Sequence, residues 1–464
     1  MFLRDTSEIA NRVAIVDDGG NQFTYGELED LSLRYKAVIP ERNLVVILCD
    51  YSIETVSFYY CQMMNHVVPI LVDKKLRTDL ISRIIEKYEP QFIWCFQNIS
   101  DKISPFVKKV IIQSENYLLI QTSFRNIEKN PDLALLLTTS GSTGSSKMVR
   151  LSYDNLRCHA NAAINTLDFS SEDRGITTLP MFHCYGLSVL HMHWMIGASI
   201  YLTEYSVLNT RFWDFFEKAQ ITNFAGVPYL YDMLKQIGFL DNNYKSLRFL
   251  TQAGAKFSDE QQKEFGRKLQ EKGIKLYLCY GQTETTSWIS RLSCEKILQK
   301  IGSVGNPVPG AFVTVENPND KGKGEIVCRG QSICLGYAND KQDLIRSDDN
   351  LGCLYTGDIG YIDEDGDIFI RGRKARFVKL LGERVSLDEL EILLSKHFET
   401  VQFICTGEDD ELRIYYLAED CPEEKILEFC SRELSIPRRL VKCYFINEIP
   451  YTKSGKIRYA DLSK

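Results

Sequence analysis

The chain has 464 residues, which is long enough for two or more domains and a large hydrophobic core. Apolar residues make up 44% and charged residues 25% of it, an ordinary composition for a globular protein. The net charge of −7 argues against a broad nucleic-acid-binding surface. The sequence contains neither an apolar run near the ~18 residues of a membrane span nor a signal-peptide pattern, so we expect a cytoplasmic protein with no membrane span and no nucleic-acid partner.

The 14 cysteines are scattered and form no CxxC pair. Their neighbours are mostly apolar, as in Val45–Cys49 and Phe92–Cys95, which is typical of reduced, buried thiols. His191 and His193 are two positions apart and would not share one face of a helix. A metal site built on histidines is therefore not expected.

The first third of the chain alternates between strand and helix patterns, which predicts an α/β layer structure with parallel strands. A capping box at Thr24–Glu27 starts the first helix. The predicted elements that follow are strands at Val45–Leu48, Val67–Val72 and Phe92–Cys95, with helices at Ile53–Met64 and Arg77–Lys87.

A segment rich in glycine and hydroxyl groups, Thr138–Lys147, follows an apolar run at Leu133–Leu137 that has the pattern of a buried strand. Glycine lets the backbone approach a ligand, successive N–H groups can form an anion-binding nest, and Lys147 adds a positive charge. The segment therefore predicts a polyphosphate-binding loop. Its spacing is not that of the common P-loop, and taken alone a flexible linker is the alternative.

In the middle of the chain, short predicted strands end in motif-like loops. Strands at Ile176–Leu179, Leu247–Thr251 and Leu276–Cys279 are followed by the loops Pro180–Gly186, Gln252–Lys256 and Tyr280–Glu284. Ligands of open α/β sheets bind at the carboxyl ends of strands, so the three loops point to one site. Other predicted elements here are a helix from Ser152 to Ile164, a strand at Ala198–Leu202, a helix at Arg211–Ala219 and a helix from Tyr229.

From about residue 302 the pattern changes to short β segments. Ile359–Ile362 and Asp367–Ile370 flank an Asp-Gly pair, which predicts a hairpin. Asp363, Asp365 and Asp367 resemble a calcium loop only in part, because the glycine comes too early and strands flank it. We therefore do not expect calcium binding.

The last part of the chain predicts a small α+β module. A capping box at Ser386–Glu389 starts a helix that runs through Leu394. Strands at Val401–Cys405, Arg413–Leu417 and Val441–Ile446 and a helix at Glu423–Leu434 complete it. We expect an α/β protein with a large multi-layer N-terminal domain, residues 1–373, of mostly parallel sheets plus a β-rich subdomain, followed by a small α+β C-terminal domain, residues 374–464.

Four motifs, in this order, resemble those of the adenylate-forming superfamily: acyl- and aryl-CoA synthetases, peptide-synthetase adenylation domains and firefly-type luciferases. Thr139–Lys147 is similar to the family's phosphate loop and Tyr280–Glu284 to its adenine and magnesium motif. Tyr355–Asp358 and Gly372-Arg373 are similar to its ribose-binding elements, and Ser454–Lys456 to the segment with its catalytic lysine. The resemblance covers nearly the whole chain.

The resemblance implies a two-step reaction that uses ATP, Mg²⁺ and a thiol, most directly that of coenzyme A. A carboxylate attacks the α-phosphate of ATP, which gives an acyl-adenylate and pyrophosphate, and the thiol then displaces AMP. Negative charge concentrates in the phosphoryl-transfer transition state, where fixed positive groups and magnesium stabilise it.

The resemblance also implies residue roles. Lys456 would bridge the attacking carboxylate and the phosphate oxygens, Thr283 would bond the α-phosphate, and Glu284 would bind Mg²⁺. Tyr280 would stack on adenine, and Asp358 and Arg373 would bind the ribose. The phosphate-loop residues would be Thr139, Ser140, Gly141, Ser142, Thr143, Gly144 and Lys147, and the small residues beside the adenine Gly254 and Ala255.

His183 lies in Leu179–Gly186, which is similar to the LPxFHxxG stretch of acyl-CoA synthetases, and is a candidate catalytic residue. The alternative for this histidine is a packed aromatic ring. Amino-acid-activating members usually carry an FDxS aspartate, which this sequence lacks. That difference favours a simple small-molecule carboxylic acid over an amino acid.

Three positions depart from the family pattern. Ser146 and Met148 stand where the family usually has proline and glycine, which leaves the phosphate nest intact but changes the expected stiffness of the loop. Ala375 stands at the position of the family's hinge Asp or Lys. A hinge need only absorb backbone rotation, so we expect alanine to affect the efficiency of thiol transfer without abolishing it.

Three alternatives stay open at this point. The acid could be loaded onto the phosphopantetheine arm of an acyl or peptidyl carrier protein, because Val378–Val385 is more similar to adenylation domains than to typical CoA ligases. A luciferase-like oxygenase uses the same first step. A non-catalytic nucleotide-binding scaffold belongs to a different class, and the presence of Lys147, Glu284, Asp358 and Lys456 argues against it.

Overall fold

The computed structural model describes residues 7–138, 147–374, 376–380, 383–399, 401–408, 410–418, 423–434, 436–451 and 457–462. Contacts divide the chain into two compact units: unit 1, Met1–Phe312 with Cys328–Leu354, and unit 2, Val313–Val327 with Tyr355–Lys464. This division places residues 355–373 with the C-terminal part of the chain, ahead of the expected boundary after residue 373. Where a moving domain begins stays a prediction.

One sheet of unit 1 has eight strands, with parallel neighbours in its centre and antiparallel neighbours towards both ends. In spatial order they are β19 (Tyr337–Ala338), β9 (Met148–Ser152), β8 (Leu133–Thr138), β4 (Val68–Asp73), β3 (Leu44–Cys49), β5 (Phe92–Phe96), β7 (Tyr117–Thr122) and β6 (Val107–Gln113). The parallel pair β3–β4 encloses α2 (Ile53–Met64) in sequence, which confirms the predicted βαβ unit. Ile81, Ile84, Ile85 and Tyr88 recur at helical spacing and enter this core.

The other sheet of unit 1 has nine strands. In spatial order they are β16 (Asn306–Pro307), β15 (Ser290–Leu292), β14 (Lys275–Tyr280), β13 (Phe249–Gln252), β12 (Asn223–Gly226), β10 (Arg174–Ile176), β11 (Ser199–Leu202), β1 (Val13–Asp17) and β2 (Gln22–Thr24). Within the run β14-β13-β12-β10-β11-β1, each strand is parallel to the next one. The mostly parallel α/β architecture is thereby confirmed for unit 1.

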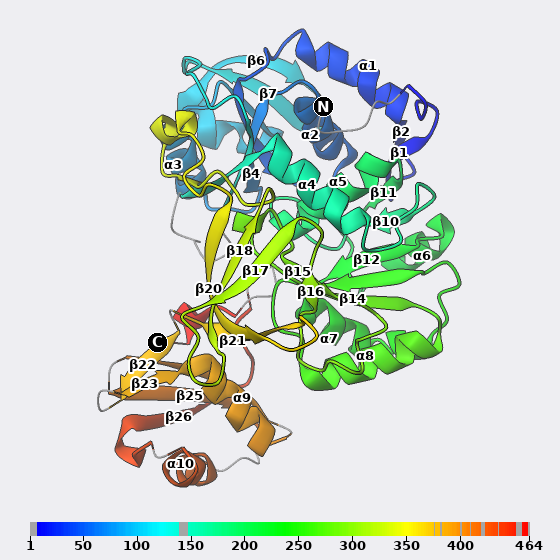
Figure 1. The fold of residues 1–464 in the computed structure, drawn as a ribbon. Helices are drawn as coiled ribbons and strands as arrows, with labels where there is room; N and C mark the ends of the chain where they lie inside the picture. The colour runs from blue at the N-terminus through cyan, green and yellow to red at the C-terminus, as the bar shows by residue number, and fades with distance from the viewer. Residues whose placement is uncertain are drawn as a thin grey trace. The chain divides into compact units, whose positions relative to one another are not determined.

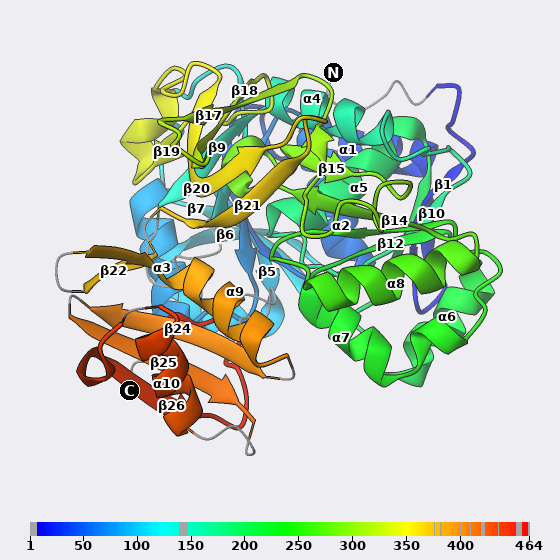
Figure 2. The same cartoon turned by 60° about the horizontal axis from the view of Figure 1, so that its bottom comes forward.

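Helices pack against the faces of both sheets (Figures 1 and 2). Those of unit 1 are α1 (Tyr25–Lys36), α2, α3 (Thr78–Tyr88), α4 (Tyr153–Ile164), α5 (Cys184–Ile196), α6 (Thr210–Ala219), α7 (Pro228–Gln236) and α8 (Asp259–Glu271). In both views α7 and α8 lie beside β12 and β14, and their apolar faces, with that of α6, fill the core of the nine-stranded sheet. Burial of each large apolar side chain contributes roughly 1.5–3 kcal/mol.

Helix α1 begins at its predicted capping box, and α4 begins at the predicted Ser152, where the structure also forms a capping box. The Thr24 hydroxyl accepts from the N–H of Glu27 at 3.2 Å, and the Glu27 carboxylate accepts from the N–H of Thr24 at 2.7 Å. Ser152 and Asn155 form the same reciprocal pair. Each box satisfies two N–H groups that a helix start would leave unpaired, so the local sequence sets both boundaries.

Two helices were missed by the sequence analysis, and one predicted strand needs correction. Helices α5 and α8 were not predicted, and α5 is buried on nearly every side, so it has no amphipathic stripe to reveal it. The predicted strand Ile176–Leu179 ends at Ile176. The hydroxyls of Thr177 and Thr178 bond the carbonyls of Thr203 and Ala225, and the chain leaves the ladder before Pro180.

The C-terminal part contains two small sheets and a hairpin. A four-stranded sheet of β17 (Ala311–Glu316), β18 (Gly324–Gly330), β20 (Cys353–Ile362) and β21 (Ile368–Arg373) includes the predicted hairpin, in which Ile362 pairs with Ile368. The last elements are the hairpin β22 (Phe377–Leu380) and β23 (Glu383–Ser386), the sheet of β24 (Gln402–Glu408), β25 (Glu411–Leu417) and β26 (Val441–Phe445), and the helices α9 (Leu387–His397) and α10 (Glu423–Arg432). These last elements share one core, which confirms a small module there.

The acidic residues of the β20–β21 turn close the hairpin. The Asp363 carboxylate accepts from the N–H groups of Asp365 at 3.1 Å and Asp367 at 2.9 Å. The three carboxylates lie within 4.8 Å of one another. Because an oxygen of Asp363 already holds the backbone of the turn, the hairpin accounts for this cluster, and we assign it no metal.

Two further observations concern membrane spans and disulfides. Within the described ranges, no helix is both long and apolar enough to cross a membrane. The thirteen cysteines in those ranges are free thiols.

The buried guanidinium of Arg150 joins β9 to the segment 335–349. It donates to the carbonyl of Leu335 at 2.6 Å, to that of Ser347 at 3.0 Å and to the Asp349 carboxylate at 2.7 Å. It also donates to the carbonyl of Arg346 at 2.5 Å. A fully buried cation is stable only when it is paired and hydrogen-bonded in this way.

We predict that Arg150→Met lowers the free energy of unfolding by about 3 kcal/mol, because three carbonyls and a carboxylate lose their donor. The measurement is the urea midpoint of unfolding. Arg157→Met is the control, since the Arg157–Asp154 pair is exposed and should change stability by less than about 0.5 kcal/mol. Equal shifts for the two variants would contradict the role of Arg150.

Candidate functional site

The three predicted loops leave one edge of the nine-stranded sheet. Gly226 pairs with Gln252 and Gln252 with Leu278 in parallel register, and β10 runs parallel to β12. The carboxyl ends of β10, β12, β13 and β14 therefore meet at the same edge, as expected for the binding edge of an open α/β sheet.

The loop after β14 is tightly folded. A Cβ on Gly281 would lie 1.7 Å from the carbonyl oxygen of Ser287, so only glycine fits there. Thr286 has a φ of +65°, a conformation that strains a β-branched residue by on the order of 1–3 kcal/mol. Between them, Thr283–Thr285 form a 3₁₀ turn. Strain of this kind is retained where the surroundings impose it, and it concentrates at functional sites.

Contacts with the segment around residue 335 hold this loop. The Thr286 hydroxyl donates to the carbonyl of Ser332 at 2.7 Å, and the carbonyl of Glu284 accepts from the N–H of Cys334 at 2.8 Å. The backbone at Glu284 and the residue two positions after it are therefore held before any ligand binds.

A chain of three side chains connects the two sheets of unit 1. The Lys147 ammonium lies 3.4 Å from the ring centroid of Tyr337, and the Tyr337 hydroxyl donates to Glu284 Oε1 at 2.8 Å. Lys147 precedes β9 of one sheet, and Glu284 follows β14 of the other. The structure thus brings together the predicted phosphate-binding lysine and the predicted metal ligand.

Tyr337 is the residue of this site that the sequence analysis missed. Only the pairing of the two-residue strand β19 with β9, Tyr337 with Val149, brings it under Lys147. Burial first, and then the Glu284 carboxylate, raise the pKa of its hydroxyl above the ordinary value. Tyr337 therefore stays protonated at neutral pH and acts as a hydrogen-bond donor.

The loop that carries His183 meets the loop of Thr283. The buried Thr283 hydroxyl donates to the Cys184 thiol at 3.5 Å, which places the start of α5 beside the 3₁₀ turn. His183 is the N-cap residue of α5 and is half-buried, with its ring 4.6 Å from that of Phe182. A Cβ on Gly186 would lie 2.3 Å from the carbonyl of Pro180, so this glycine permits the close turn of the loop.

The other histidines near this helix are interior groups. Burial lowers the pKa of His191 to about 3 and that of His193 to about 4. His191 Nε2 lies 2.7 Å from the Tyr59 hydroxyl, and His193 Nδ1 lies 2.7 Å from the carbonyl of Val189. These two rings are therefore neutral packing groups.

Gly254, Ala255 and Tyr280 lie at the same sheet edge. Gly254 has a φ of +91°, and the Gln252 amide donates to the carbonyl of Ala255 at 3.0 Å. Gly254 and Ala255 are exposed, and Tyr280 is half-buried at the end of β14. Small residues and a partly exposed ring at the ends of adjacent strands are compatible with the predicted adenine contacts.

In unit 2, the two predicted ribose ligands lie together. Asp358 on β20 pairs in register with Arg373 on β21, and Arg373 Nε lies 2.7 Å from Asp358 Oδ1. The N–H of Asp358 donates to the Thr356 hydroxyl at 3.1 Å, which orients the buried aspartate, while Arg373 is half exposed.

Seven of the predicted site residues lie outside the described ranges: Thr139, Ser140, Gly141, Ser142, Thr143, Gly144 and Lys456. The hinge candidate Ala375 lies outside them as well. Next to the Lys456 segment, Tyr451 and Ile457 form an antiparallel bridge. Of the departures from the family pattern, Met148 is described, and its side chain packs in the core of the eight-stranded sheet.

Known proteins identify the family. Residues 3–338 match the model of the AMP-binding enzyme family. A 2-succinylbenzoate–CoA ligase from Bacillus mycoides is 30% identical over 71% of this chain and 69% of its own length. A 4-coumarate–CoA ligase from Arabidopsis thaliana is 29% identical over 97% of this chain and 87% of its own length.

Solved structures show the same fold at lower identity. An o-succinylbenzoate CoA synthetase from Bacillus subtilis, in complex with its acyl-adenylate intermediate, has a TM-score of 0.79 and 22% identity, covering 98% of this chain and 95% of that one. An ATP-bound enzyme from Rhodopseudomonas palustris has a TM-score of 0.78 and 20% identity, covering 99% and 96%. The predicted fold class is confirmed, and from its own residues and these relatives the chain belongs to the AMP-binding, adenylate-forming enzyme family.

Proposed function

We propose that this chain is an ATP-dependent, AMP-forming ligase that joins a carboxylic acid to coenzyme A. The observation that carries the proposal is the Lys147–Tyr337–Glu284 chain at the carboxyl edge of the nine-stranded sheet. It lies in a member of a family whose relatives over most of this length are CoA ligases. The predicted enzyme class is confirmed by those relatives, whereas the residue roles below are proposals.

In the first step, an oxygen of the acid carboxylate attacks the α-phosphorus of ATP, and the bond to pyrophosphate breaks. Lys147 compensates the charge on the terminal phosphates, and the Thr283 hydroxyl donates to the α-phosphate. Lys456 approaches the same phosphorus with the acid. His183, half-buried beside the Thr283 loop, faces the acid. Positioned donors and cations of this kind stabilise charge that develops only in the transition state.

Glu284 fits the role of a magnesium ligand. One oxygen accepts from Tyr337, and the other forms no hydrogen bond or ion pair with a described residue. A carboxylate held in this way is a hard oxygen donor, which Mg²⁺ prefers. When bound, the ion neutralises phosphate oxygens of ATP. The Tyr337 hydroxyl holds the Glu284 carboxylate in position, so the carboxylate need not be ordered when Mg²⁺ binds.

Asp358 and Arg373 of unit 2 are the proposed ribose contacts. A buried, oriented carboxylate can accept from both ribose hydroxyls, and Arg373, half exposed, can contact the sugar beside it. Tyr280, Gly254 and Ala255 are the proposed neighbours of the adenine, because they lie on the strand edge that carries Thr283.

In the second step, the sulfur of the thiol attacks the acyl carbonyl carbon. The bond between that carbon and the phosphate oxygen of AMP breaks, and the thiol proton passes to solvent. Coenzyme A is the proposed acceptor because the curated relatives are named as CoA ligases. The carrier-protein alternative rests on the Val378–Val385 segment alone.

The acid is proposed to carry an aromatic ring. Both compared relatives are named for aryl-bearing acids, 2-succinylbenzoate and 4-coumarate. The cytoplasm is the proposed location, supported by the free thiols.

The test is ATP–pyrophosphate exchange across aryl, fatty, hydroxy and amino acids, with magnesium and without a thiol. Exchange with one class establishes adenylation and names the substrate class. Repeating that assay with CoA, and then with a carrier protein, identifies the acceptor. If no acid supports exchange while ATP still binds, the scaffold alternative replaces the proposed enzyme.

We predict that Lys456→Ala reduces acid-dependent pyrophosphate exchange by at least about a hundredfold, because the charge between the carboxylate and the α-phosphate is lost. ATP affinity should change little. Transfer from preformed acyl-AMP to the thiol should survive, since the lysine acts only in the first step. Normal exchange by this variant would contradict the assignment of Lys456.

We predict that Tyr337→Phe lowers the exchange rate about tenfold, because a hydrogen bond to a charged group contributes roughly 1.5–3 kcal/mol. The ring remains under Lys147, so the variant isolates the bond to Glu284. Tyr444→Phe is the control, since Tyr444 is 40% exposed on β26. A rate in Tyr337→Phe equal to that of the control would rule out an orienting role for this hydroxyl.

A further inference from the structure

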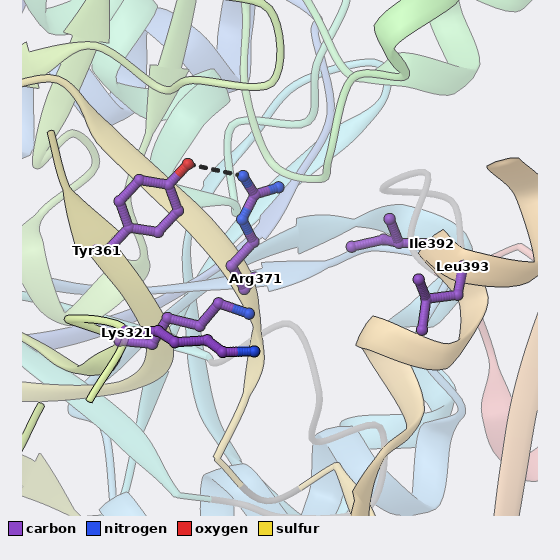
Figure 3. A pocket seen from close by; sticks show the side chains of 6 residues that line it. Lys321, Tyr361, Arg371, Ile392 and Leu393 are labelled. Atoms are coloured by element: carbon purple, nitrogen blue, oxygen red, sulfur yellow. Dashed lines mark hydrogen bonds between the residues drawn. The ribbon is translucent and has the colours of Figure 1, made fainter. Parts of the chain in front are cut away.

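Unit 2 contains a cavity of about 470 Å³ that the proposed reaction does not use. Figure 3 shows the side chains that line it: Lys321, Lys323, Tyr361, Arg371, Ile392 and Leu393. Three of the six are cations, and no carboxylate is among them. None of the six is a proposed contact of ATP, the acid or Mg²⁺.

Aromatic stacking holds Arg371 in place. Its guanidinium carbon lies 5.2 Å from the ring centroid of Tyr361 and 5.6 Å from that of Phe369. The two rings stack at 4.9 Å, and Arg371 Nη2 donates to the Tyr361 hydroxyl at 2.9 Å. Arg371 forms no ion pair with a described carboxylate, so its other N–H groups are available to an anion.

A short turn positions the two lysines. The Asn319 side chain accepts from the N–H of Lys321 at 3.0 Å and from that of Lys323 at 3.1 Å, and the Asn319 N–H donates to the carbonyl of Lys323 at 2.8 Å. The backbone between β17 and β18 is therefore fixed by hydrogen bonds of its own. Figure 3 shows Lys321 extending to the Arg371 side of the cavity. Its ammonium group has no partner among the described residues.

The opposite wall is apolar. Ile392 and Leu393 project from α9 towards the cavity (Figure 3), and Leu393 is 44% exposed. The volume lies within the 300–1,000 Å³ typical of small-molecule sites, which is larger than a lone phosphate ion requires. A ligand that fills it must carry an organic part next to its charged group.

We propose that this cavity binds a phosphate-bearing organic ligand. A phosphate group pairs with the Lys321 ammonium, which has no partner among the described residues, and Arg371 offers it a bidentate contact. The organic part of the ligand covers Ile392 and Leu393. In the proposed reaction, the nucleotide end of coenzyme A carries both parts of this chemistry, the phosphate groups and an organic nucleoside.

Such a ligand would act on the step that follows adenylation, and this consequence rests on the proposed function. Lys321 and Arg371 precede the hinge candidate Ala375 in sequence, whereas Ile392 and Leu393 follow it. A ligand that contacts residues on both sides of Ala375 in the chain would bind one relative arrangement of α9 and β21 more tightly than the other arrangements. It therefore shifts the population towards that arrangement.

The test is calorimetric titration of the full chain without ATP, so that no other nucleotide competes for the cavity. Binding that is lost when the cavity lysines are changed is assigned to the cavity. The probes are adenosine 3′,5′-bisphosphate, which is the nucleotide half of coenzyme A, and pyrophosphate. Wild type is compared with Lys321→Gln/Lys323→Gln, which alters only a surface turn and should fold normally. The matched control is Lys108→Gln/Lys109→Gln on β6, an exposed pair with the same change of charge.

We expect the Lys321/Lys323 variant to bind a probe at least tenfold more weakly than wild type and the control, with pyrophosphate exchange unchanged. A loss for the bisphosphate, with or without a loss for pyrophosphate, supports the nucleotide end of coenzyme A as the ligand. A loss confined to pyrophosphate overturns the proposal of an organic ligand. Equal affinities in all three proteins, or an equal loss in the control, overturn the proposal. If no acid supports ATP–pyrophosphate exchange, the proposed enzyme activity is wrong, but the binding result for the cavity still stands.

Discussion

The buried guanidinium of Arg150 is the contact on which the geometry of the site depends. It ties β9 to the carbonyls of Leu335, Arg346 and Ser347 and to the Asp349 carboxylate. The same segment supplies Tyr337 to Glu284, and the residues just before it, Ser332 and Cys334, contact the loop after β14. A buried cation that is paired through both of its Nη atoms is costly to displace, so it holds a loop-rich segment where packing alone would not.

Strain and charge are concentrated in that loop. Thr286 has a positive φ, and Gly281 approaches the Ser287 carbonyl so closely that a side chain cannot enter. The hydrogen bonds from the neighbouring segment offset this strain before a ligand arrives. The Glu284 carboxylate is oriented in advance, so it loses less conformational freedom when it binds Mg²⁺. Groups that are already in position can stabilise developing charge without first rearranging.

Features that depend on a short run of the chain form where the sequence predicts them. The capping box at Thr24 forms as predicted, because both partners lie within four residues of one another. The motif loops at the strand ends were found because parallel strands place their carboxyl ends together. Helix α5 was missed since a helix buried on all sides carries no periodic signal.

From residues alone, the order and spacing of the motifs determined the family, the two-step chemistry and most of the candidate site, because each motif is a short run of the chain. Only the tertiary structure decided that Tyr337 links Lys147 to Glu284, since these residues lie 190 and 53 positions apart from it and meet through a two-residue strand. It also decided the cationic cavity, whose lining comes from three separate segments. Long-range contacts of this kind leave no pattern in the sequence, because they depend on how whole sheets and helices pack.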